Sequence, residues 1–130
     1  MKTLIDTYCY TALMRGDESV AQFLDDAEIV YLSTIAAGEL MTGFKGGSME
    51  RQNRLGLKEF IQKGGKTIIA SVGMETAERF ALIKDALKRK GKPIPVNDIW
   101  IAAQCMETGA ILLSRDLHFS AIEGLLVWQP

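Results

Sequence analysis

The sequence predicts an α/β fold, a three-layer α/β/α sandwich around a mainly parallel central sheet. Short apolar runs rich in β-branched residues alternate with longer segments of helical periodicity, and this order is typical of parallel sheets. The 130 residues are 48% hydrophobic and 24% charged, the composition of an ordinary globular domain. Because the sequence contains no linker, repeat or low-complexity tract, one domain is expected over residues 1–130.

The first strands and helices are defined by apolar runs and by the turn residues between them. Thr3–Ile5 is a short apolar run that predicts a buried strand. Helical periodicity covers Thr7–Met14 and stops at Gly16, and a second helix is expected over residues 18–25. Ile29–Leu32, which is β-branched and aromatic, predicts the second strand.

The middle of the chain continues the alternation. Ser33 or Thr34 provides an N-cap for a third helix that extends through Gly43. A glycine-containing break is followed by a polar helix over Met49–Gln62. Thr67–Ala70 is the third predicted strand.

The longest helical pattern covers Met74–Lys90. Its expected inner face consists of Met74, Ala77, Phe80, Ala81 and Leu87. Lys84 also falls on this stripe, where it either extends to the rim of the fold or points toward the acidic residues described below.

The last part of the chain adds one helix and two strands. Residues 91–95 form a rigid connection with two prolines, which leads into a helix over residues 98–107. Gly109 ends that helix. Ile111–Leu113 is the fourth predicted strand, and Leu126–Trp128 is the fifth.

Four carboxylates occupy positions where strands end or helices begin. Asp6 and Asp116 follow the first and fourth strands, and Asp98 opens a helix. Glu39 lies on the third helix among apolar or small neighbours rather than on a charged face. Because open α/β sheets bind ligands at the carboxyl ends of their strands, these side chains are expected to share one rim.

Such a group of acids is typical of a metal site. Like charges held together are tolerated near neutral pH when a cation balances them, and oxygen ligands favour Mg²⁺ or Mn²⁺. These ions support hydrolysis of phosphodiesters. The only histidine, His118, argues against a zinc site and is expected to be structural. Taken singly, each acid has another possible role, as a helix-capping acid (Asp6, Asp98 and Asp116) or as a surface side chain (Glu39).

The charge is unevenly distributed although its sum is only −1. Residues 45–92 carry twelve basic and five acidic side chains, whereas residues 1–44 carry two basic and seven acidic ones. A positive segment beside an acidic cluster suits a polyanion, and it equally describes two solvated helix faces.

The bulk features exclude two classes of protein. No stretch approaches the ~20 apolar residues of a membrane-spanning helix. Cys9 and Cys105 have neither the number nor the spacing of a disulfide scaffold or a metal site. We therefore expect a cytoplasmic protein with reduced, packed thiols and no membrane partner.

With these features together, the sequence resembles the PIN-domain ribonucleases, specifically the VapC toxins of toxin–antitoxin pairs, over nearly its whole length. The resemblance is carried by Leu4–Thr7, by Ser33–Leu40 with Gly43, by Lys88–Asp98 with Ile101–Ala103, and by Gly109–Ala110 with Ser114–Phe119.

The resemblance implies a PIN-like fold and a Mg²⁺-dependent endoribonuclease in which Mn²⁺ substitutes for Mg²⁺. It also implies RNA as the substrate, a cognate antitoxin that blocks the site, and a homodimer. The implied catalytic residues are Asp6, Glu39, Asp98 and Asp116, of which Asp6, Asp98 and Asp116 are the metal ligands. Polar side chains that would hold these acids in place are Thr7, Asn97 and Ser114.

Some residues leave the function open. Lys84 and Arg115 are candidates for phosphate contact, and for each the alternative is an intramolecular salt bridge. Tyr8 stands where the family usually has Asn, so a phenol replaces an amide. This departure favours a second candidate function, a catalytically weak PIN domain that acts as a binding module in a complex. A phospho-receiver domain is disfavoured because it needs an acidic pair at the end of the first strand, where Asp6 stands alone.

Overall fold

A computed structural model describes all 130 residues and contains one five-stranded sheet in the order β3-β2-β1-β4-β5. The strands are β1 (Lys2–Ile5), β2 (Ile29–Ser33), β3 (Thr67–Ala70), β4 (Ile111–Leu113) and β5 (Val127–Trp128). Every neighbouring pair of strands is parallel. The predicted parallel sheet and its five strands are therefore confirmed.

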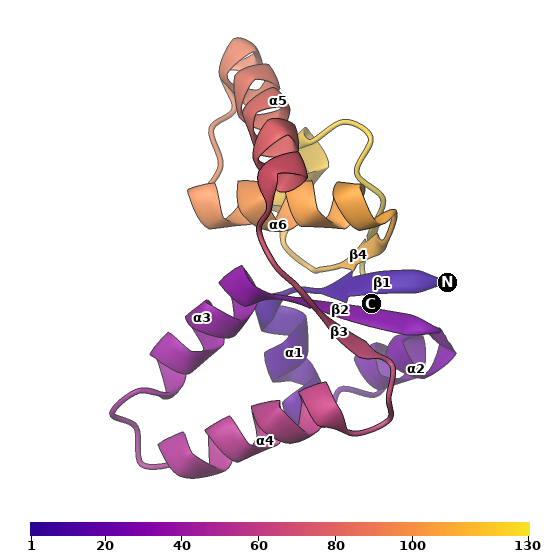
Figure 1. Ribbon diagram of the computed structural model, residues 1–130, viewed down its shortest axis with the longest axis vertical. Helices are drawn as coiled ribbons and strands as arrows, with labels where there is room; N and C mark the ends of the chain where they lie inside the picture. Colours follow the sequence, from indigo (N-terminus) through magenta and orange to yellow (C-terminus); the bar gives the residue numbers. More distant parts are fainter.

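Helices cover both faces of this sheet. They are α1 (Thr7–Met14), α2 (Glu18–Asp26), α3 (Thr34–Phe44), α4 (Glu50–Gln62), α5 (Met74–Lys90), α6 (Val96–Thr108) and a short 3₁₀ helix, η1 (Leu117–Ala121). In Figure 1, α1 to α4 lie on one side of the sheet, and α5 and α6 lie on the other. The three-layer α/β/α arrangement is confirmed. No helix is long and apolar enough to cross a membrane.

Three helices begin at a side-chain cap, and two of these caps lie at the end of a strand. Asp6 accepts a hydrogen bond from the backbone of α1, Asp17 does so for α2, and Ser33 for α3. The start of α6 differs from the prediction: this helix begins at Val96, two residues before Asp98. The extended backbone of Pro95 ends the preceding segment, so Asp98 lies within the first turn instead of opening the helix.

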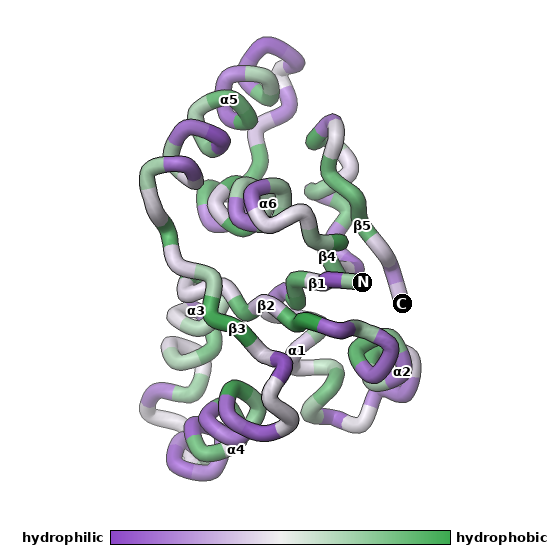
Figure 2. Tube along the Cα trace, turned by 45° about the vertical axis from the view of Figure 1, so that its right-hand side comes forward, coloured by the Kyte–Doolittle hydropathy of each residue, from purple (hydrophilic) through white to green (hydrophobic).

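The centre of the core is formed by β1 and β4. Leu4, Ile5, Leu112 and Leu113 have no exposed surface, because both faces of these inner strands are covered by helices. Figure 2 shows apolar residues along the strands and polar residues along the outer surfaces of α4 and α5. Buried apolar side chains at the middle of the sheet fix the position of the loops that follow β1 and β4.

The predicted inner face of α5 is partly wrong. Met74 is 80% exposed and Ala81 is exposed, whereas Thr76, Ile83 and Leu87 are buried. The helix packs mainly against α6, and a threonine joins its apolar stripe because the Thr76 hydroxyl is satisfied: it donates to Glu107 at 2.5 Å and accepts from the Gly73 N–H at 3.0 Å.

Candidate active site

The four predicted carboxylates line one cavity of about 360 Å³. Asp6 follows β1 and Asp116 follows β4, and these strands are neighbours in the sheet. From β1 the strand order continues to β2 and β3 on one side and to β4 and β5 on the other, so the two aspartates lie at the topological switch point. Asp98 joins them from the first turn of α6, and Glu39 from the middle of α3.

Asp6 is the most buried of these acids, with 4% of its surface exposed. One carboxylate oxygen accepts from the Cys9 N–H at 2.8 Å, and the other accepts from the Ser114 hydroxyl. Burial raises the pKa of Asp6, these two hydrogen bonds oppose the rise, and the Asp116 charge adds to it. The ionised form of Asp6 is therefore held at an electrostatic cost.

Asp98, Asp116 and His118 form the tightest group of possible metal ligands, with one ligand atom of each within 4.8 Å of the others. His118 Nδ1 lies 3.2 Å from a carboxylate oxygen of Asp98 and 3.2 Å from one of Asp116. Burial raises the pKa of Asp98, its contact with His118 opposes this, and the charges of Asp116 and Glu39 raise it further. No local sequence pattern indicates that His118 lies between two of the acids.

Two of the three predicted supporting residues contact the acids. The Thr7 hydroxyl donates to Glu39 Oε1 at 2.9 Å. The Ser114 hydroxyl donates to Asp6 and accepts from the Asp116 N–H at 3.0 Å, so one side chain fixes two acids relative to each other. Asn97 is exposed at the start of α6 and does not line the cavity.

The two predicted phosphate contacts lie elsewhere. Lys84 does not line the cavity, and its ammonium group lies 5.7 Å from the centre of the Phe80 ring. Arg115 is engaged in an ion pair with Asp17 at 2.8 Å, which lowers the pKa of Asp17 to about 2. For Arg115 the intramolecular salt bridge, the alternative left open by the sequence, is what the structure shows.

Other residues line the same cavity although the sequence pattern did not single them out as a group. One group reaches the cavity from α1 and consists of Tyr8, Thr11 and Arg15. An apolar part of the wall is formed by Ile101 and Phe119. The signal was the spacing i, i+3, i+7 of the first three, which puts them on the same side of α1 as the cavity.

The chemistry of the donor set fits a hard dication. Carboxylate oxygens dominate, and only one imidazole nitrogen is near, which suits Mg²⁺ or Mn²⁺ better than zinc. Burial and mutual repulsion raise the pKa of Asp6 and Asp98, and a bound dication would relieve both effects. The residues present therefore fit such an ion.

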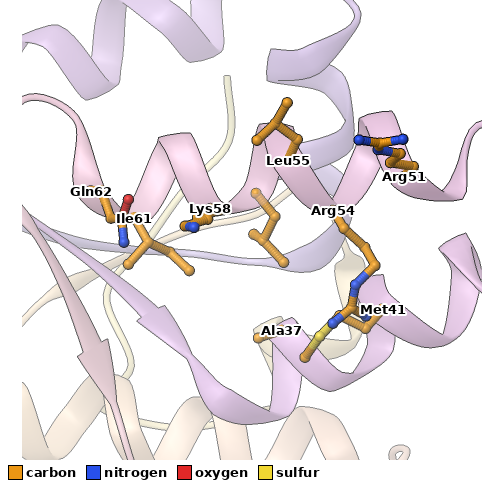
Figure 3. A pocket seen from close by; sticks show the side chains of 9 residues that line it. Ala37, Met41, Arg51, Arg54, Leu55, Lys58, Ile61 and Gln62 are labelled. Carbon is orange, nitrogen blue, oxygen red and sulfur yellow. The ribbon is translucent and has the colours of Figure 1, made fainter.

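A larger cavity lies elsewhere. A groove of about 530 Å³ runs between α3 and α4 (Figure 3). It is lined by Ala37, Met41, Arg51, Arg54, Leu55, Leu57, Lys58, Ile61 and Gln62. None of these residues is an acid, a histidine, a cysteine, a serine or a threonine. The groove thus lacks groups for hydrolytic chemistry.

Comparison with known proteins gives one family match. The sequence matches the family model of the PIN domain over residues 3–125. A curated relative, Ribonuclease VapC2 of Haemophilus influenzae, is 29% identical over 120 residues, which are 91% of this chain and 89% of the relative.

Solved structures with the same fold cover nearly the whole chain. VapBC2 from Rickettsia felis, bound to a DNA fragment from its promoter, superposes with a TM-score of 0.88 at 20% identity and covers 100% of this chain and 99% of the matched chain. FitAcB from Neisseria gonorrhoeae superposes with a TM-score of 0.77 at 26% identity, covering 97% and 96% of the two chains.

Proposed function

This chain belongs to the PIN domain family, and we propose that it is a metal-dependent endoribonuclease that acts as the toxin of a toxin–antitoxin pair. One observation carries the assignment: Asp6, Glu39, Asp98 and Asp116, from four separate segments, converge on one cavity. The name of its Haemophilus influenzae relative supports ribonuclease activity. The VapBC complexes with the same fold support an antitoxin partner.

Asp98, Asp116 and Asp6 are the residues that would hold Mg²⁺ or Mn²⁺. Bound there, the ion would supply an activated water and stabilise the leaving oxygen of an in-line displacement at phosphorus. The Ser114 hydroxyl, which contacts both Asp6 and the Asp116 backbone, fixes the separation of two of these acids. Thr7 orients Glu39, which completes the acidic wall.

The surroundings of the acids keep this arrangement rigid. The Asp6 carboxylate is covered by the first turn of α1 and by β4, so it cannot swing away without breaking the hydrogen bonds from Cys9 and Ser114. His118 bridges Asp98 and Asp116 and so holds α6 to the loop after β4. These hydrogen bonds and ion pairs hold the carboxylates toward one cavity.

The proposal includes partners and a location. An RNA-cleaving toxin needs an antitoxin that closes its cavity, and we expect a cognate antitoxin to do so here. Cys9 and Cys105 are both buried free thiols, which supports a reducing, cytoplasmic location. The homodimer that the family resemblance implied stays a prediction.

A second function is favoured by Tyr8. Tyr8 is 75% exposed and lines the cavity, at the position where the family usually has Asn. A binding module with weak catalysis would retain the cavity while substrate positioning is lost. Titration calorimetry with Mn²⁺ separates the two functions, because a pure binding module has no need to bind the ion through these acids.

The direct test is cleavage of RNA by the purified chain with Mn²⁺ or Mg²⁺. We expect Asp98→Asn to lower the rate roughly 1000-fold, because several kcal/mol of transition-state stabilisation depend on the ion. Asp26→Asn, which removes an exposed acid at the end of α2, is the matched control and should cleave like wild type. Full activity of Asp98→Asn would contradict the assignment.

A test in cells follows from the toxin role. Expression of the chain without a partner should arrest growth, and expression of Asp6→Asn should not, because the acidic cavity is then incomplete. Colony counts and sequencing of RNA ends after brief expression measure both outcomes. Equal growth arrest by the two proteins would mean that toxicity does not come from RNA cleavage.

A further inference from the structure

The face of α1 beside the acidic cavity extends that cavity beyond its carboxylates. Tyr8, Thr11 and Arg15 share this face, and all three line the cavity. The same three side chains also line a second hollow of about 350 Å³, which continues to Gly16 and Asp17. They therefore form a ridge with the acids on one side and a second concave surface on the other.

Arg15 is the only basic side chain that lines the acidic cavity. It is exposed and takes part in no ion pair. The nearest acid in sequence, Asp17, is held by Arg115 at 2.8 Å and accepts hydrogen bonds from the start of α2. Arg15 thus presents a free guanidinium group, with the fork geometry that binds phosphate, at the edge of a strongly anionic site.

Tyr8 differs from the other tyrosine of the same helix. Tyr10 is 2% exposed and packs edge-on against Phe60, with ring centres 5.2 Å apart. Tyr8 is 75% exposed and has no aromatic partner. The Tyr8 ring contributes little to the core, and its faces are accessible to a planar ligand such as a nucleobase.

We propose that Tyr8 and Arg15 form a subsite that holds single-stranded RNA beside the acidic cavity, with Arg15 pairing with a phosphate and Tyr8 stacking on a base. This assignment depends on the ribonuclease activity proposed above. Tyr8 and Arg15 are seven positions apart, which is about 10 Å along the helix axis and the length of about three nucleotides in a stacked strand. Tyr8 then replaces the usual amide with a stacking surface, so the substitution changes how RNA is held and leaves the four acids in place.

The subsite is tested by RNA binding in the Asp98→Asn background, where cleavage is suppressed. The probe is a fluorescein-labelled, mixed-sequence single-stranded RNA of about twelve nucleotides, with anisotropy measured over a range of salt concentrations. Arg15→Ala should weaken binding roughly 10-fold and lower the salt slope by about 0.7, the value for one phosphate contact to a single strand. Tyr8→Ala should weaken it roughly 5- to 100-fold, and Tyr8→Phe should restore it because the ring still stacks.

Arg51→Ala is the matched control, because it removes the same charge from an exposed position on α4, away from the acids. The subsite is wrong if Arg15→Ala and Tyr8→Ala bind like the parent protein, or if Arg51→Ala weakens binding as much as Arg15→Ala does. Both target side chains are exposed, so their substitution should leave the fold intact, and circular dichroism checks this. Arg15→Gln and Tyr8→Asn are polar substitutes for the alanine variants.

Two further measurements separate this inference from the proposed function. Calorimetry should show that neither Tyr8→Ala nor Arg15→Ala weakens Mn²⁺ binding, because neither side chain forms a hydrogen bond or an ion pair with Asp6, Asp98 or Asp116. If the wild-type chain cleaves RNA and the two variants show an unchanged KM, the subsite fails and the ribonuclease stands. If the wild-type chain neither binds Mn²⁺ nor cleaves RNA, the ribonuclease itself fails.

Discussion

The two main cavities of this protein differ in how they are built. The α3–α4 groove is larger, about 530 Å³ against about 360 Å³ for the acidic cavity, and two consecutive helices form it. Its lining combines apolar side chains with Arg51, Arg54 and Lys58. The acidic cavity draws its lining from α1, α3, α6 and the segment after β4, and its carboxylates are bound to neighbouring hydrogen-bond donors.

Electrostatic cost therefore identifies a reactive site better than cavity volume does. Burial and like charge raise the pKa of Asp6 and Asp98, whereas the groove is lined by apolar side chains and exposed cations. A fold retains such a cost when a function needs the groups. Substitutions that change one cavity at a time should therefore have separable effects.

The largest expected effect is that substitutions in the acidic cavity lower RNA cleavage, whereas substitutions in the groove lower stability. Asp116→Asn should lower RNA cleavage roughly 1000-fold with little change in the free energy of unfolding. Leu57→Ala, at a position 5% exposed on the groove floor, should cost about 2–5 kcal/mol of stability and leave the rate per folded molecule unchanged. Urea titrations measure the stability of both variants, and cleavage assays measure their rates. If Leu57→Ala loses more activity than its unfolded fraction explains, the groove also contributes to RNA cleavage.

An intermediate effect is expected from the hydroxyl that links two acids. Ser114→Ala removes a donor to Asp6 and an acceptor for the Asp116 N–H, so the metal affinity should fall roughly 10- to 100-fold. Ser48→Ala, in the exposed turn between α3 and α4, is the matched control. Calorimetry measures the Mn²⁺ affinity of both variants. Equal affinities of Ser114→Ala and Ser48→Ala would mean that the Ser114 contacts do not organise the site.

The smallest effect concerns stability without metal. The folded-state pKa of Asp6 is raised above its usual 3.8, so the folded state holds this proton more tightly than the unfolded state does. Stability is therefore highest below pH 3.8 with respect to this group and falls as the pH rises through the raised value. At pH 7 in a chelator, Asp6→Asn should melt at a higher temperature than wild type, and the difference should disappear in acid.

Added Mn²⁺ should reverse the order of the two melting temperatures, because only the wild-type Asp6 carboxylate is stabilised by binding the ion. Thermal melts at pH 7 with and without Mn²⁺ measure the reversal. If wild type is the more stable protein even in chelator, the hydrogen bonds from Ser114 and Cys9 outweigh the burial of Asp6.

The sheet could be predicted from the sequence because its strands are short, apolar and separated by clear turn signals. The acids could be located because strand ends and helix starts fix where side chains such as Asp6 and Asp116 must lie. The helix α5 was harder: periodicity selected Met74, which is exposed, and passed over Thr76, which is buried because Glu107 and Gly73 satisfy its hydroxyl. A buried polar residue with distant partners leaves no periodic signal.

The same limit applies to the site. Ser114 and Thr7 could be predicted because each is near an acid in sequence or in family pattern. The contact of His118 with both Asp98 and Asp116 depends on how the 3₁₀ helix η1 turns after β4. The pairing of Arg115 with Asp17, across 98 residues, likewise depends on tertiary packing and on no local pattern.

The pairing of β1 with β4 also has a consequence for the timing of synthesis. Asp6 and Ser114 are 108 positions apart, and Asp116 comes later still. At the usual elongation rate, roughly 5–20 s pass between the translation of the first acid and the last. A nascent chain therefore lacks a complete acidic cavity for nearly all of its time on the ribosome.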